Sequence, residues 1–398
     1  MNIKDEIAAM GKKSVAAAYE LAEMSTKKKN SILEAMANGI EEQKAAIRAA
    51  NEKDLVAGRE AGLNSALLDR LELTDKRMDG MINGLRNVVA LQDPVGDEIS
   101  SWIRPNGLNI RKIRVPIGVI AIIFESRPNV AAEAAALCFK TANALILRGG
   151  KEAIHSNRAV VEAMQSGGEA KGLPANSIQL VQTTDRSAVK ELVQLSECID
   201  LVIPRGGEGL IKAVTEMAHV PVIKHYKGVC HTYIDESADV DMALDIAINA
   251  KCQRPGVCNA METLLVHSKI ADAILPRLKE RLDSKDVEIR GDSRTRSILP
   301  GIKTATEEDW HAEYLDMILA IRVVGSVEEA VAHINKYGSH HSDAIVANDE
   351  SSQKFFTRGV DSATVYVNAS TRFTDGGEFG LGAEIGISTD KLHARGPM

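Results

Sequence analysis

The chain has 398 residues, too many for one ordinary hydrophobic core, so two or three domains are expected. The formal net charge of −7 argues against a general binder of nucleic-acid backbones, and an aromatic content of 4% argues against modules that stack bases. An apolar content of 44% and a charged content of 26% are typical of a soluble globular protein.

The first ninety residues are predicted to be helical. Residues 3–60 contain no proline, are rich in Ala, Glu, Lys and Leu, and repeat their apolar positions at helical spacing. Residues 65–92 are predicted to form further helix, closed by Asp93-Pro94. From 108 to 115, apolar and basic residues alternate, which predicts a half-exposed strand.

Buried strands and helices alternate from Val119 onward. Val119–Phe124 is a continuous apolar run, as expected of a strand covered on both faces. Further strands are expected at 144–147, 178–181, 201–203 and 221–223, and helices at 130–141, 156–171, 186–194 and 209–217. This repeat predicts a parallel doubly wound sheet that binds ligands beyond the carboxyl ends of its strands.

A second α/β segment is predicted from Val229 onward. Its expected strands are 230–234, 262–266, 341–347 and 364–367, and its expected helices are 242–250, 271–282 and 327–335. Short strands and loops are expected over 283–325, and Gly-rich loops after Asn368. The predicted domains are 1–100 with 118–228, then 229–398, with a small arm at 101–117.

The sequence favours a cytoplasmic protein without a metal site. The N-terminus lacks the apolar core of a secretory signal, and the densest apolar run is too short to span a bilayer. The five cysteines have no spacing typical of a disulfide framework or a zinc site, which suits a reducing cytoplasm. His340-His341-Ser342-Asp343 offers two histidines but no further ligand at convincing spacing, so a structural or substrate-facing loop is favoured.

Cys258 lies in the segment Gln253-Arg-Pro-Gly-Val-Cys-Asn259. The Pro-Gly turn before it and the apolar run after it place a nucleophile-capable sulfur where a loop enters a strand. The alternative is an inert buried thiol, because free cysteine mostly behaves as a small hydrophobe and reacts only where its surroundings favour the thiolate. The local sequence leaves both interpretations open.

Three loops follow strands of the first predicted sheet. Asn129 opens a helix after one strand, where its amide could donate to an oxyanion or simply cap the helix. Arg148 and Lys151 flank two glycines, a pattern that suits a phosphate such as the 2′-phosphate of NADP, or a solvated turn. Residues 203–210 have the strand, Gly-rich turn and helix of a nucleotide loop but depart from the G-x-G-x-x-G pattern.

The order of these features resembles the aldehyde dehydrogenase superfamily. It runs from Pro128-Asn129 through Arg148 and the Gly-rich turn at 205–209 to Cys258, and then to Glu313 in His311-Ala-Glu-Tyr314. The resemblance covers essentially the whole chain, including the tail segments 379–386 and 393–398. It implies an aldehyde dehydrogenase-like α/β fold with two doubly wound α/β domains plus a small β oligomerisation arm.

The resemblance implies the NADPH-dependent reduction of L-glutamyl 5-phosphate to L-glutamate 5-semialdehyde, with release of phosphate, in proline biosynthesis. Cys258 would be the nucleophile that forms an acyl-thioester, and Asn129 an oxyanion donor. The expected NADPH/NADP contacts are Arg148 near the adenosine ribose, Gly206 and Gly207 near the cofactor, and Glu313 near the nicotinamide ribose. No metal, nucleic acid or membrane partner is implied.

One departure from the superfamily affects the chemistry. Hydrolytic members carry a Glu-Leu-Gly-Gly segment whose Glu activates water, whereas this chain has Lys224-His-Tyr-Lys-Gly228 there. A thioester on Cys258 must be kept from water, so the missing Glu agrees with a reductase. Arg254 or Lys224 is a candidate cation for favouring the thiolate.

The resemblance also implies assembly and leaves alternatives open. It implies a homodimer or higher homo-oligomer built through the arm, and a functional association with glutamate 5-kinase. One alternative is a CoA-acylating aldehyde dehydrogenase, which would need CoA instead of phosphate. Another is a non-catalytic nucleotide-binding protein of the same fold, which would not need the thiol of Cys258.

Overall fold

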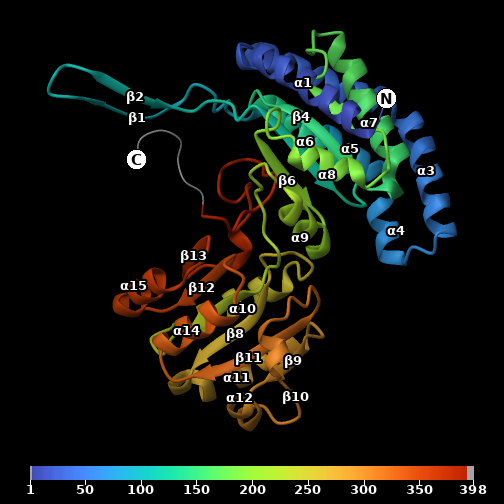
Figure 1. The fold of residues 1–398 in the computed structure, drawn as a ribbon. Helices are drawn as coiled ribbons and strands as arrows, with labels where there is room; N and C mark the ends of the chain where they lie inside the picture. Colours follow the sequence, from blue (N-terminus) through green and yellow to red (C-terminus); the bar gives the residue numbers. More distant parts are fainter. Residues whose placement is uncertain (1, 392–398) are drawn as a thin grey trace. The chain divides into compact units, whose positions relative to one another are not determined.

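The computed structural model describes residues 2–391 (Figure 1). Unit 1 comprises the chain up to Lys224 together with Gly382–Gly386, and unit 2 comprises His225–Leu381 with the described residues from Ile387 onward. The tail segment at 393–398 that contributes to the family resemblance lies outside the described residues. Among the described helices, none has both the length and the apolar character needed to cross a membrane.

Unit 1 opens with five helices. They are α1 (Ile3–Ala22), α2 (Thr26–Glu42), α3 (Lys44–Glu60), α4 (Ser65–Leu71) and α5 (Asp75–Ala90). The helix predicted over 65–92 is present as two helices, because the chain leaves the helical conformation between α4 and α5. At this break Asn51 Oδ1 accepts from the N–H of Leu73, and the side chain of Thr74 caps α5 by accepting from the N–H of Arg77.

The sheet of unit 1 has four parallel strands in the order β5-β4-β3-β6. These are β3 (Val119–Phe124), β4 (Ala144–Gly149), β5 (Ile178–Leu180) and β6 (Leu201–Arg205), connected through α6 (Asn129–Lys140), the short η1 (Lys151–Ala153), α7 (Ile154–Glu169), α8 (Ser187–Gln194) and α9 (Glu208–Met217). The predicted parallel doubly wound sheet is confirmed, although the strand expected at 221–223 is reduced to a single bridge between Val202 and Val222.

The arm is an antiparallel hairpin of β1 (Glu98–Ile103) and β2 (Asn109–Ile113). The predicted strand at 108–115 is thus present as β2, but β1 was not predicted. Nearly every residue of both strands is exposed, including large apolar side chains such as Trp102 and Ile103. An isolated two-stranded hairpin has no core of its own to bury such side chains.

Unit 2 is built on seven parallel strands in the order β10-β9-β11-β8-β7-β12-β13. The strands are β7 (Cys230–Ile234), β8 (Met261–His267), β9 (Glu288–Gly291), β10 (Lys303–Thr304), β11 (Ile318–Val324), β12 (Ser342–Val346) and β13 (Thr364–Val367). The helices are α10 (Val240–Cys252), α11 (Ser268–Asp283), α12 (Ser293–Ile298), α13 (Glu307–Trp310), α14 (Val327–Tyr337), α15 (Glu350–Gly359) and the short η2 (Thr371–Phe373). Strands β7, β8 and β12 are buried along their whole length.

Two segments of unit 2 differ from expectation. Residues 283–325, expected as short strands and loops, contain α12, α13 and the seven-residue β11, which pairs with both β8 and β9. Helix α15 was not predicted; Phe356 is its one residue classed as buried, so its apolar pattern is faint. Local capping starts these helices: Asp292 caps α12, and Asp349 caps α15.

Candidate active site

Cys258 lies on a tight turn at the amino end of β8. The N–H of Ala260 donates to the carbonyl of Val257 at 3.0 Å, which closes the turn around the thiol. The Cys258 carbonyl accepts from Sγ of Cys230 at 3.2 Å. Gly228 packs against the same carbonyl so closely that a Cβ at 228 would lie 1.7 Å from it. Only glycine allows this approach, so Gly228 sets how closely the segment before β7 packs against the turn that carries Cys258.

Two imidazoles flank the thiol. His225, Cys258 and His341 each offer one metal-ligand atom, and these atoms all lie within 4.8 Å of one another. The two rings meet edge to face, with centroids 5.4 Å apart and an interplanar angle of 72°. Nδ1 of His225 lies 2.8 Å from the carbonyl oxygen of Ile387. Since a carbonyl can only accept, Nδ1 carries a proton, and in the neutral ring the lone pair is then on Nε2.

His341 is fully buried at the start of β12. Its Nδ1 lies 2.8 Å from Oγ of Ser342, while its Nε2 has no hydrogen-bond partner within the part of the chain that the structure describes. Burial, with a smaller contribution from nearby His225, lowers the pKa of His341 to about 4. The ring is therefore neutral at neutral pH and presents a lone pair instead of a positive charge.

The residue after the nucleophile anchors the turn from the other side. Nδ2 of Asn259 donates to the carbonyl of Thr374 at 2.8 Å, and Oγ1 of Thr371 donates to the carbonyl of Asn259 at 2.7 Å. Arg372 donates from Nη1 to Oδ1 of Asn259 and from Nε to Oε1 of Gln253 at 2.7 Å. These bonds join η2 to the loop that carries the thiol, so the turn is held by partners more than 100 residues away.

Arg372 is the cation that this network brings to the nucleophile loop. Burial and neighbouring Arg254 lower the pKa of Arg372. It lines a small polar cavity of about 200 Å³, whose walls are formed by Asn249, Gln253, Arg372, Phe373, Asp375 and Glu378. The sequence identified Arg254 as a possible cation here but gave no reason to select Arg372.

A buried ion pair supports the amino end of β8. Nζ of Lys251 lies 2.6 Å from Oε2 of Glu262, and both side chains are fully inaccessible to solvent. Oε1 of Glu262 also accepts from the N–H of Leu315 at 3.1 Å. Burial raises the pKa of Glu262 to about 7, against the attraction of Lys251. The pair connects the end of α10, the start of β8 and the loop before β11.

Glu313 is the other predicted site residue in unit 2. Its Oε1 accepts from the N–H of Gly228 at 2.8 Å. Because Gly228 touches the backbone of Cys258, the Glu313 carboxylate and the thiol share one support. Cys258 and Glu313 are therefore connected through Gly228, which contacts both, although they are 55 positions apart in sequence.

Gly206 and Gly207 lie in unit 1, between β6 and α9. This is the switch point of the sheet, where the connections after β3 and β6 lead to opposite sides. Both glycines are exposed, and the N–H of Gly207 donates to Oε2 of Glu125 at 3.0 Å. The N-cap of α9 is Gly207, which has no side chain with which to cap the helix.

Arg148 lies at the carboxyl end of β4 and is mostly buried. Its guanidinium donates to the carbonyls of Gly149 at 2.9 Å and Thr184 at 3.2 Å, while Nε has no partner among the described residues. Lys151 lies three positions on, in η1, and is exposed. Of the two basic residues at this edge, Lys151 is therefore the more exposed.

Asn129 is the first residue of α6 and does not cap it, because no capping bond is made at that helix start. Its Nδ2 instead donates to Oε1 of Glu133, one turn later, at 2.8 Å. Asn129 belongs to unit 1 and Cys258 to unit 2. The contact that the structure gives for the Asn129 amide is the one to Glu133, within unit 1.

The sequence missed three residues of this site, namely His225, His341 and Arg372. His341 was noted within the His-His-Ser-Asp segment, but its partners are 116 and 83 positions away. His225 lies in the segment singled out for its missing Glu. Arg372 carried no local signal, because it is one of many basic residues in a loop.

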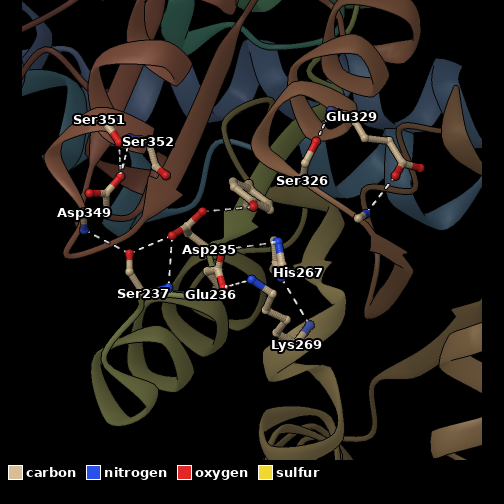
Figure 2. Close-up of polar contacts among 12 residues, drawn as sticks. Asp235, Glu236, Ser237, His267, Lys269, Ser326, Glu329, Asp349, Ser351 and Ser352 are labelled. Carbon is tan, nitrogen blue, oxygen red and sulfur yellow. Dashed lines mark hydrogen bonds and ion pairs between the residues drawn. The ribbon is translucent and has the colours of Figure 1, made fainter.

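The carboxyl end of the same sheet has a different character (Figure 2). Asp235 follows β7 and accepts from the N–H and Oγ of Ser237 at 3.0 and 2.6 Å. Oγ of Ser237 in turn accepts from the N–H groups of Asn348 and Asp349, which follow β12, at 3.1 and 2.9 Å. Figure 2 shows these groups bonded to one another across the ends of the strands. This end is closed by its own side chains.

Comparisons with known proteins agree with the predicted fold. The family model described as the aldehyde dehydrogenase family matches residues 3–298. Gamma-glutamyl phosphate reductases of Moorella thermoacetica and Halothermothrix orenii are 57% and 54% identical over 398 residues, which is 100% of this chain and 95% of each relative. A crystal structure of gamma-glutamyl phosphate reductase from Thermotoga maritima has a TM-score of 0.94 at 49% identity, covering 98% of this chain and 95% of that one.

Proposed function

We propose, from the membership of this chain in the aldehyde dehydrogenase family, that it reduces L-glutamyl 5-phosphate to L-glutamate 5-semialdehyde with release of phosphate. Within the family, the chain groups with the gamma-glutamyl phosphate reductases. The enzyme is an NADP-dependent oxidoreductase of proline biosynthesis. The observation that carries the proposal is a partly buried thiol between two imidazoles, in a chain that matches such reductases from end to end. No disulfide joins the five cysteines within the described residues, which supports the cytoplasmic location that we propose.

Cys258 is the nucleophile of this mechanism. Its thiolate attacks the acyl carbon of the acyl phosphate, phosphate leaves with the electrons of the C–O bond, and an acyl-thioester remains on Sγ. We assign His225 as the acceptor of the thiol proton, because one of its ring nitrogens lies within 4.8 Å of Sγ of Cys258 and a neutral imidazole can accept a proton. Asn259 and Gly228 hold the turn in place during attack.

The residues of unit 1 fit a dinucleotide phosphate. Exposed Gly206 and Gly207 precede a helix start without a side-chain cap, and Lys151 supplies an accessible positive charge at the same edge of the sheet. Arg148 holds the backbone around that edge. We propose that these four residues contact NADPH and that Glu313 contacts its nicotinamide ribose. NADPH supplies, when bound, the hydride that reduces the thioester to a thiohemiacetal.

The chain's own residues then complete the reaction. The thiohemiacetal collapses to the aldehyde and returns the electrons of the C–S bond to Cys258, which recovers its proton from His225. We assign Asn129 as a donor to the oxyanion formed during attack, since a side-chain amide suits that role. Water stays unactivated because the usual Glu is absent, and His225 cannot act as a base while it holds the thiol proton.

A steady-state assay of the reverse reaction tests the proposal. With the semialdehyde, NADP and phosphate, we expect NADP reduction that depends on phosphate, and a loss of at least about a thousandfold in kcat for Cys258→Ala. Cys252→Ser is the matched control, because Cys252 lies six residues earlier and is also partly buried. A requirement for CoA in place of phosphate would overturn the substrate assignment, and undiminished activity of Cys258→Ala would overturn the covalent mechanism.

We also propose that the protein is a homodimer or higher homo-oligomer that assembles through the arm. Ile99, Trp102 and Ile103 of β1 are 50%, 45% and 73% exposed, and a second copy would cover them. Light scattering at micromolar concentration checks this, and a monomer there would contradict it. A functional association with glutamate 5-kinase would shorten the time that the acyl phosphate spends in water, which the lag of a coupled assay measures.

A further inference from the structure

We propose that His225, Cys258 and His341 form a binding site for a thiophilic divalent cation of the Zn²⁺ type, and that the bound cation shuts off the nucleophile reversibly. The three residues come from the loop before β7, the turn before β8 and the start of β12. All three belong to unit 2, so the site is complete within it.

The ligand set selects the class of cation. One thiolate and two imidazoles suit Zn²⁺ and comparable transition metals, whereas Mg²⁺ and Ca²⁺ require oxygen ligands. In a tetrahedral site with Zn–S and Zn–N bonds of about 2.3 and 2.05 Å, neighbouring ligand atoms are about 3.3 to 3.6 Å apart. The three atoms of this cluster already lie within 4.8 Å of one another. Closure therefore requires ligand movements of about 1 Å, which His225 can supply because it lies on a loop.

Both histidines are prepared for coordination. A metal-bound imidazole usually donates its other N–H to a carbonyl or carboxylate, which fixes the ring and its tautomer. His225 has this arrangement, with Nδ1 at 2.8 Å from the carbonyl oxygen of Ile387. His341 is completely buried and its Nε2 has no partner among the described residues, which is costly for a polar atom unless a ligand uses it. A buried Nε2 without a partner among the described residues is a second observation that suits a ligand at His341.

The chemistry of binding is a ligand exchange without oxidation. The Cys258 thiol loses its proton to solvent, and its sulfur gives an electron pair to the cation in place of a bound water. Three protein ligands leave a fourth position for water or phosphate. The sulfur can no longer attack an acyl carbon, and removal of the cation restores it. The inhibition rests on the proposed function, whereas the binding of the cation does not.

Cobalt(II) is the spectroscopic probe for Zn²⁺ at this site. Titration of the full-length protein with Co²⁺ is expected to give one equivalent per chain, with a thiolate-to-metal charge-transfer band and intense d–d bands of tetrahedral Co²⁺, both displaced by Zn²⁺. Cys258→Ser should remove the charge-transfer band. His225→Ala should weaken Co²⁺ affinity at least about tenfold. The matched controls are Cys252→Ser and His340→Asn; asparagine suits position 340 because its φ is +60°.

Each outcome decides the proposal. A charge-transfer band that survives in Cys258→Ser, or Co²⁺ affinity that is unchanged in His225→Ala, would overturn it. If His225→Ala does not fold, Cys258→Ser still decides, since serine preserves the size of the side chain. The activity assay is expected to show that micromolar Zn²⁺ inhibits, that a chelator reverses the inhibition and that Mg²⁺ has no effect. An inactive wild-type protein that still binds Co²⁺ through Cys258 would refute the proposed function and leave this site intact.

Discussion

The two ends of the sheet in unit 2 are made from the same strands and have opposite chemistry. At the carboxyl end, Asp235, Ser237 and Asp349 satisfy one another (Figure 2). At the amino end, Cys258 lies beside His225 and His341, and Nε2 of His341 has no hydrogen-bond partner among the described residues. Parallel sheets usually bind ligands beyond their carboxyl ends. In this sheet, the proposed nucleophile lies at the amino end of the strands and not at the end that topology favours.

The closure of the carboxyl end includes charged groups. Nζ of Lys269 lies 2.6 Å from Oε2 of Glu236, and the N–H of Lys269 donates to Nδ1 of His267 at 3.2 Å. Ser237 joins the segments that follow β7 and β12, at the switch point of this sheet. A ligand there would have to displace these bonds. Substitutions at the carboxyl end should therefore change stability and leave catalysis intact.

The largest change in stability is expected at the amino end, from Lys251→Met. This substitution leaves the Glu262 carboxylate buried without its partner, which costs about 3–5 kcal/mol of unfolding free energy. Urea unfolding measures this loss. The double variant Lys251→Met with Glu262→Leu should recover most of it, because an apolar pair of similar volume avoids the desolvation of both charges. A single variant as stable as the wild type would show that the pair does not support the nucleophile turn.

The cost of Lys251→Met should also depend on pH. The folded-state pKa of Glu262 is already raised to about 7 by burial, and it rises further when Lys251 is absent. Below its unfolded-state pKa near 4.5, such a carboxyl group is protonated in both states and costs no stability. As pH rises from there through the folded-state pKa, the unfolded state ionises more readily, and the folded protein loses stability. The variant should therefore lose less stability at pH 5.5 than at pH 8. An equal loss at both values would mean that Glu262 stays ionised.

A smaller effect is expected at the carboxyl end from Asp235→Ala. The change removes the acceptor for the hydroxyl of buried Tyr233, at 3.1 Å, and for both groups of Ser237. Leaving such groups unpaired costs about 1–3 kcal/mol. Asp235→Asn is the control, since its amide oxygen still accepts. The kcat of folded Asp235→Ala should equal that of the wild type, and a large fall in kcat would contradict the separation between the two ends.

Much of the fold could be predicted from the sequence because it is encoded locally. Val119–Phe124 and Cys230–Ile234 were predicted at their observed bounds, since continuous apolar runs mark strands covered on both faces. Strand β11 was harder to predict, because Arg322 interrupts its apolar pattern and its neighbours β8 and β9 are distant in sequence. The hairpin partner β1 was missed because its residues bury nothing within the chain.

The site could be predicted only where a single residue carried the signal. The turn before Cys258 is local, so the nucleophile was a candidate from its own surroundings. The cluster around it is not local: His225 and His341 reach the thiol only because β7, β8 and β12 are neighbours in the sheet. Ligand spacing along the chain could not reveal such a site, and for that reason the sequence predicted no metal site.

The smallest effect is expected from Ser326→Ala, at the carboxyl end where α14 begins. Oγ of Ser326 accepts from the N–H of Glu329 at a long 3.3 Å, and the side chain of Glu329 still accepts from the N–H of Gly325 at 2.7 Å (Figure 2). Because the second bond survives, the variant should lose only about 0.5–1 kcal/mol in urea unfolding. Ser326→Asn should restore the cap. A change in kcat with either variant would mean that the closed end communicates with the thiol.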